Sequence, residues 1–83
     1  MLRVLFFASL REQLGVAEQA IDVPVPATVG ALVTQLRARG DTWSEVLAAG
    51  KRWRVAVNQD MATLETPLKS GDEIAIFPPV TGG

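Results

Sequence analysis

The chain has 83 residues, of which 48% are hydrophobic and 20% are charged. This length and composition predict one small folded domain and not a disordered chain. Eight basic and nine acidic residues give a formal net charge of −1, and no basic stripe is present to bind nucleic acid. No apolar run is long enough to span a bilayer and no signal peptide is recognisable, so we expect a cytoplasmic protein.

The chain contains no Cys, no His and no Tyr. It therefore has no thiolate nucleophile, no disulfide and none of the usual zinc or iron ligands, and we expect no bound metal. Any sulfur or acyl chemistry must use a carboxyl group of this chain or the residues of a partner.

The beginning of the chain predicts two strands that form a hairpin. Residues 2–8 are rich in Val, Leu and Phe, and residues 18–23 alternate between apolar and polar side chains. Between them, residues 9–14 predict a short helical turn that Gly15 caps.

The middle of the chain predicts two helices. Thr28 is a good N-cap for a main helix that Gly40 closes, and Thr42 and Glu45 have the spacing of a capping box for a second, shorter helix. We expect Trp43 to cover the core. The main helix carries apolar residues at the spacing of one helical face: Val29, Leu32, Val33 and Leu36.

The last part of the chain predicts three further strands at 53–58, 61–64 and 73–77, with polar turns between them. The order of elements predicts an α+β fold of the ubiquitin-like β-grasp class. In this fold a mixed sheet of about five strands packs on one main helix plus a short second helix. The first and last strands should run parallel at its centre.

Strand alternation predicts two faces for this sheet. The inward face consists of Leu2, Val4, Phe6, Ile21, Val23, Val55, Val57, Ile74 and Ile76, and the outward face of Arg3, Leu5, Phe7, Arg54, Ala56, Glu73, Ala75 and Phe77. Arg3 and Glu73 should pair at one end of the outward face. At the other end we expect an apolar partner interface formed by Leu5, Phe7, Ala75 and Phe77, because exposed apolar patches often mark interaction sites.

The C-terminus predicts a chemical role. Pro78 and Pro79 fix φ and remove two donors, so the last strand cannot continue through them. Gly82 and Gly83 then leave a bare carboxylate on a backbone thin enough to enter a narrow cavity. We expect a β-grasp domain over 1–77 and a flexible C-terminal tail over 78–83.

Three parts of the sequence are similar to one known family. They are Phe6-Phe7-Ala8 leading into Arg11-Glu12, then Asn58, and finally the run from Gly71-Asp72-Glu73 through Pro78-Pro79-Val80-Thr81-Gly82-Gly83. With these motifs the chain resembles the molybdopterin synthase small subunits of the MoaD/ThiS family, which are ubiquitin-like sulfur carriers. The resemblance extends over essentially the whole chain, and the C-terminal run is its most specific part.

The resemblance implies that Gly83 is the reacting residue. An adenylating enzyme related to ubiquitin activators would use ATP to adenylate its carboxyl group, and a sulfur-donor system would convert it to a thiocarboxylate. The tail residues Pro78, Pro79, Val80, Thr81 and Gly82 would insert Gly83 into the large subunit of molybdopterin synthase. There the sulfur would pass to cyclic pyranopterin monophosphate and form the molybdopterin dithiolene.

The same resemblance implies that this chain is a non-catalytic small subunit, that it binds no cofactor, and that the catalytic groups belong to the large subunit in a heterotetramer. Three alternatives stay open at this point. The chain could carry sulfur for thiamine thiazole synthesis, modify proteins in the manner of ubiquitin, or serve as a β-grasp interaction module that does not use the tail.

Overall fold

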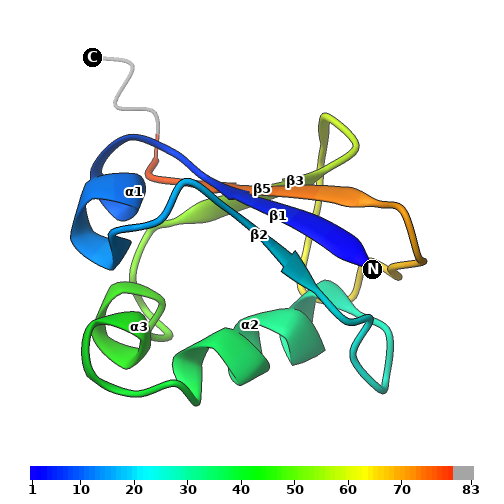
Figure 1. Cartoon of the computed structure of the whole chain (residues 1–83), viewed down its shortest axis with the longest axis horizontal. Helices are drawn as coiled ribbons and strands as arrows, with labels where there is room; N and C mark the ends of the chain where they lie inside the picture. The colour runs from blue at the N-terminus through cyan, green and yellow to red at the C-terminus, as the bar shows by residue number, and fades with distance from the viewer. Residues whose placement is uncertain (80–83) are drawn as a thin grey trace.

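The computed structural model describes residues 1–79 and consists of a five-stranded sheet with its helices packed against one face (Figure 1). The strands are β1 (Leu2–Phe6), β2 (Glu18–Ile21), β3 (Arg54–Val57), β4 (Asp60–Met61) and β5 (Glu73–Phe77), and the helices are α1 (Ala8–Leu14), α2 (Val29–Arg37) and α3 (Asp41–Val46). The spatial order β2-β1-β5-β3-β4 places β1 and β5 in parallel, and all other neighbours are antiparallel. This mixed sheet confirms the predicted β-grasp fold.

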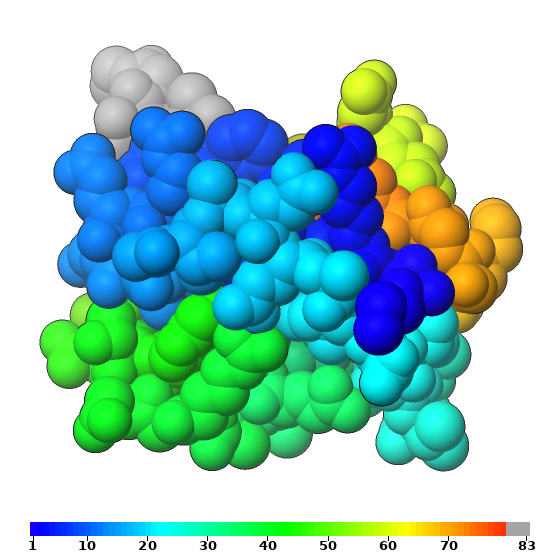
Figure 2. Space-filling model, viewed as in Figure 1, coloured from blue at the N-terminus to red at the C-terminus, as the bar shows by residue number. Residues whose placement is uncertain are grey.

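The core lies between the sheet and α2, as strand alternation predicts. The inward residues of the two central strands are at most 1% exposed, and Ile21 and Val23 pack against the same core while staying half-buried. In Figure 2 the green atoms of α2 and α3 lie directly against the α1 and β2 part of the surface. The main core residues are Leu2, Val4, Phe6, Val29, Leu32, Val33, Leu36, Ile74 and Ile76.

Two predicted helix caps are confirmed. Gly15 has a left-handed conformation with φ 73°, and its N–H donates to the Arg11 carbonyl over 2.9 Å at the end of α1. The Thr28 hydroxyl accepts a hydrogen bond from the Ala31 N–H over 3.1 Å at the start of α2. Local hydrogen bonds therefore fix the end of α1 and the start of α2 as predicted. The predicted end of the main helix at Gly40 is wrong, because α2 ends at Arg37 with Ala38 as its C-cap.

The start predicted for the second helix is wrong. The N-cap of α3 is Gly40 and not Thr42, because the chain reverses at Gly40 with φ 80° and its carbonyl accepts the N–H groups of Trp43 and Ser44. Asp41, the first residue of α3, also has a positive φ of 48°, so the helix begins within this tight turn. The corner also brings Trp43 onto the core, where its ring meets Phe6 edge-on at 5.4 Å between centroids.

Several strands are shorter than predicted. The first strand ends at Phe6 because Ala8 turns with φ 52° into α1, and β2 ends at Ile21, ahead of the proline-containing loop. The short edge strand lies at 60–61 instead of 61–64. Ala56 was expected on the exposed face but is only 7% exposed, because its small side chain lies in β3 with β5 on one side and β4 on the other.

Candidate functional site

The four residues predicted for the partner interface share the sheet face that lies opposite the core. Leu5 and Ala75 are direct neighbours across β1 and β5, and Phe77 ends β5. The Phe7 N–H donates to the Ile76 carbonyl over 3.1 Å, so the strand pairing continues one residue beyond β1. Phe7 is 44% exposed and the other three are half-buried.

The apolar surface extends further than the sequence predicts, up to the edge strand. Ala75 pairs with Ala56, and Ala56 pairs with Met61. Directly paired residues have their side chains on the same face, so a row of apolar residues crosses the sheet from Leu5 to Met61. Met61 is 66% exposed. We call Leu5, Phe7, Ala56, Met61, Ala75 and Phe77 the apolar patch.

The opposite end of this face is polar and internally paired. The expected contact between Arg3 and Glu73 is present, with 3.3 Å between Nη1 and Oε2. A shorter contact that sequence reasoning missed joins Arg3 Nε to Glu18 Oε2 over 2.8 Å. The hydrogen bond with Arg3 lowers the pKa of the Glu18 carboxyl.

Next to this ion-pair cluster lies a buried carboxylate, Asp72, which is 4% exposed. The Asn58 side-chain amide donates to Oδ1 over 2.9 Å and the Lys69 N–H donates to Oδ2 over 2.9 Å. These two hydrogen bonds hold the pKa of Asp72 below its ordinary value. The Asn58 side-chain oxygen also accepts the Glu73 N–H over 3.0 Å, so this network ties the turn after β3 to the start of β5.

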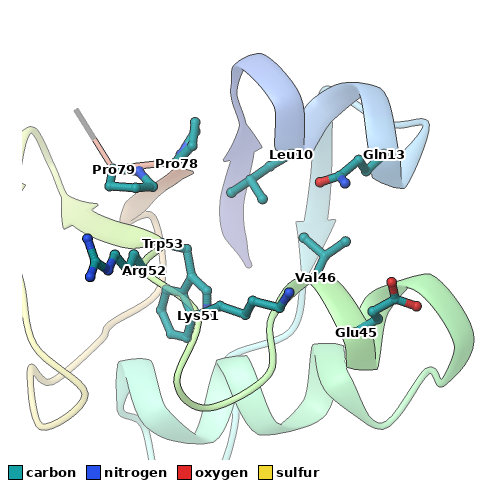
Figure 3. Close-up of a pocket in the computed structure, with 9 residues that line it drawn as sticks. All are labelled: Leu10, Gln13, Glu45, Val46, Lys51, Arg52, Trp53, Pro78 and Pro79. Atoms are coloured by element: carbon teal, nitrogen blue, oxygen red, sulfur yellow. The ribbon is translucent and has the colours of Figure 1, made fainter. Parts of the chain in front are cut away.

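The chain leaves the sheet beside a small pocket, at the same end as Phe77. Pro78 and Pro79 form part of its wall and are half-buried. The pocket has a volume of about 170 Å³, and Figure 3 shows α1, α3 and the segment before β3 around it. Since the prolines also fix φ, the exit direction of the chain is set where it touches the folded domain. The other lining residues are Leu10, Gln13, Glu45, Val46, Lys51, Arg52 and Trp53.

The remaining predicted site residues, Val80, Thr81, Gly82 and Gly83, lie outside the described residues, so their roles stay predictions. Most of the predicted tail domain, 78–83, lies there too. Within residues 1–79, no group of three or more acidic side chains is arranged to hold a metal ion. In the same range no helix is both long and apolar enough to cross a membrane. The candidate site in the described residues therefore consists of the apolar patch and of the two prolines that set the direction in which the C-terminal segment leaves the sheet.

Known proteins are similar to this chain in sequence and in fold over nearly its whole length. A molybdopterin synthase sulfur carrier subunit from Haemophilus influenzae is 48% identical over 83 residues, which is 100% of both chains. A solved complex of subunits 1 and 2 of molybdopterin-converting factor from Helicobacter pylori contains a chain with a TM-score of 0.68 and 29% identity. That match covers 99% of this chain and 97% of the other.

A third relative belongs to a different functional class. The solution structure of small archaeal modifier protein 1 from Methanosarcina acetivorans has a TM-score of 0.75 and 26% identity, with 99% of this chain and 95% of that chain covered. The family model described as ThiS family matches residues 4–83. The match runs through the sheet, the apolar patch and the C-terminal glycines, and the chain therefore belongs to the ThiS family.

Proposed function

We propose that this chain is the sulfur carrier subunit of a molybdopterin synthase and that Gly83 carries the sulfur as a C-terminal thiocarboxylate. The observation that carries the proposal is the end-to-end match, at 48% identity, with a molybdopterin synthase sulfur carrier subunit of the same extent. The site geometry supports it, because the apolar patch lies beside the point where the C-terminal segment leaves the sheet.

Activation of Gly83 needs a partner. A carboxylate resists nucleophilic attack because its charge repels the nucleophile and its leaving group would be oxide. In the proposed cycle an adenylating enzyme joins the carboxylate to AMP from ATP, with release of pyrophosphate. Sulfur from a donor system then replaces AMP. The ATP belongs to the activating enzyme, and this chain supplies only the carboxyl group.

Delivery of the sulfur requires docking on the large subunit. The exposed Phe7 ring, the half-buried Phe77 ring and a row of smaller side chains form an apolar surface at the end of the sheet where the C-terminal segment begins. Burying such aromatic residues is a common way to stabilise an interface. The stiff pair Pro78 and Pro79 would lower the entropy lost when the following residues enter the partner's active site. We therefore expect the apolar patch to pack on the large subunit while Gly83 reaches the pterin substrate.

The acid–base and cationic groups of the transfer step are assigned to the large subunit. This chain has no Cys and no His to act as nucleophile or proton carrier. In that sense Gly83 is a carried substrate, and two successive transfers of sulfur would complete one dithiolene.

A second candidate function is protein modification, and the similarity to small archaeal modifier protein 1 favours it. Both functions begin with adenylation of a C-terminal glycine. They differ in the acceptor of the acyl adenylate, which is a sulfur donor for a carrier and a lysine amine for a modifier. The end product of activation therefore separates the two candidates.

The test uses the full chain, its activating enzyme, a sulfur donor and the large subunit in a reconstituted synthase. Removing Gly83, or adding one residue after it, should abolish sulfuration of the pterin precursor and leave the thermal unfolding of the domain unchanged. A domain of the same stability is expected because Gly83 lies six positions beyond Phe77, the last residue of β5. Sulfuration at the normal rate by either variant would refute the carrier proposal.

A further inference from the structure

Three cations lie close together where the C-terminal segment leaves the sheet. Lys51, Arg52 and Arg54 are three of the eight basic residues of the chain, and all three are exposed. Arg54 is the direct neighbour of Phe77 across β3 and β5. We call these three residues the basic rim.

The basic rim surrounds the exit of the chain from two sides. Lys51 and Arg52 line the pocket whose wall contains Pro78 and Pro79. In Figure 3 the Lys51 side chain extends with its ammonium group toward Val46, whereas the Arg52 guanidinium points away from Val46. Arg54 lies on the outward face, beside Phe77, so the rim is continuous with the apolar patch.

The basic rim forms no ion pair within residues 1–79, in contrast to Arg3 and Lys69. Arg3 is paired with Glu18 and Glu73, and Lys69 contacts Asp72 at 3.9 Å. Glu45 lines the same pocket as Lys51 without forming an ion pair with it. Without a carboxylate partner, these charges form no ion pair that would stabilise the described domain. Its charge is available to a partner.

We infer that the basic rim is a docking element for acidic side chains that surround the opening through which the large subunit admits the C-terminal segment. This inference rests on the proposed function. Gly83 is four residues beyond Pro79, and a fully extended stretch of this length reaches about 14 Å. An opening that receives Gly83 must therefore come close to Pro79, and the partner surface around it lies over the basic rim.

The same distance argues against a nucleotide or pterin phosphate as the ligand of the rim. In the proposed cycle such a phosphate would bind near the reacting carboxyl group of Gly83, which is four residues away from Pro79. A protein surface that covers the exit is the anionic partner within reach of these side chains. Exposed charges at the edge of an interface chiefly steer association, so they should act on the association rate and on its dependence on salt.

The test measures the association rate of the full chain with the large subunit by stopped flow at low and high salt. The variant Arg52→Gln with Arg54→Gln should associate about tenfold more slowly than the unsubstituted chain at low salt. The difference should vanish near 1 M salt, where the screening length falls to about 3 Å.

The matched control is Arg37→Gln with Lys69→Gln, which removes two positive charges elsewhere on the molecule. Arg37 lies in the last turn of α2, and Lys69 precedes β5. This control should associate within about twofold of the unsubstituted rate, because charges remote from the interface have little effect on steering. Thermal unfolding of both variants shows that each is folded.

Equal association rates for the two double variants would overturn the inference, and so would a loss that persists at high salt. A slower rate with the activating enzyme alone, and not with the large subunit, would also contradict it. If the unsubstituted chain fails to bind the large subunit at all, the proposed function itself is refuted.

Discussion

The two ends of the outward sheet face use their polar groups in opposite ways. At the end near the N-terminus, Arg3 is paired with two carboxylates, and Asp72 is held by Asn58 and by a backbone N–H. At the end where the C-terminal segment begins, Phe7 is exposed, and the cations Lys51, Arg52 and Arg54 have no ion-pair partner among residues 1–79. The same two parallel strands, β1 and β5, therefore connect a region that stabilises the fold to a region that is free to bind.

This difference implies that stability and recognition can be changed separately. A substitution at the polar end should lower the free energy of unfolding and leave binding to the large subunit intact. A substitution in the apolar patch should weaken binding to the large subunit and leave the free energy of unfolding unchanged. Substitutions in the two regions can test this separation.

The largest effect should come from a charge in the apolar patch. Phe7→Arg should weaken binding to the large subunit about 10- to 100-fold, because it removes a ring from the interface and buries a charge without a partner. Isothermal calorimetry measures the affinity. Val25→Arg is the matched control, since Val25 is 95% exposed and lies in the loop before α2, away from the patch. Equal affinities of the two variants would refute the assignment of the patch.

The next effect concerns the turn after β3. Asn58→Gly keeps the left-handed backbone at this position, where φ is 50°, but removes both side-chain hydrogen bonds of the network. Leaving the Asp72 carboxylate without this donor should cost about 1–3 kcal/mol of unfolding free energy. Urea unfolding measures this loss.

A control for the Asn58 variant exists at the next residue. Gln59 also has a positive φ, 72°, and its side chain is exposed, so Gln59→Gly makes a similar backbone change without touching the network. It should change stability much less. If both variants lose the same free energy, backbone freedom and not the hydrogen bonds explains the effect of Asn58→Gly.

A smaller effect should appear in acid. Because the pKa of Asp72 is lowered in the folded chain, its contribution to stability is complete above its unfolded pKa of about 3.9 and is lost as the pH falls through the lower folded value. Asp72→Asn should therefore be less stable than the unsubstituted chain at neutral pH, and the difference should shrink below about pH 4. Urea unfolding from neutral pH to acid measures the difference. A difference that is independent of pH would contradict the role of the ionised carboxylate.

Sequence reasoning succeeded where the signal is local or periodic. Alternation in β1 and β5 predicted both the buried side chains and the apolar side chains of the opposite face. Thr28 and Gly15 were identifiable because each cap is fixed by hydrogen bonds within one helical turn. Leu5 and Ala75 could be placed in one patch in advance because the β-grasp topology places β1 beside β5, and the structure shows that they are direct neighbours.

Sequence reasoning failed where the result depends on register or on a corner. Met61 joins the patch only because it pairs with Ala56, and Glu18 reaches Arg3 only in the register that β2 adopts. Neither register is visible in the sequence pattern. Thr42 has the spacing of an N-cap residue, but the tight turn at Gly40 makes Gly40 the N-cap, so α3 begins earlier than predicted. The pocket at the exit of the chain is lined by α1, α3 and the segment before β3, which lie far apart in the sequence. No local sequence motif therefore predicts it.

The central claim, that Gly83 carries sulfur, is tested most directly by the intact mass of the chain after incubation with its activating enzyme, ATP and a sulfur donor. We expect a gain in mass equal to the exchange of one oxygen for one sulfur, and no gain for a chain that lacks Gly83. An unchanged mass while ATP is consumed, or a gain that corresponds to conjugation with a lysine, would contradict it.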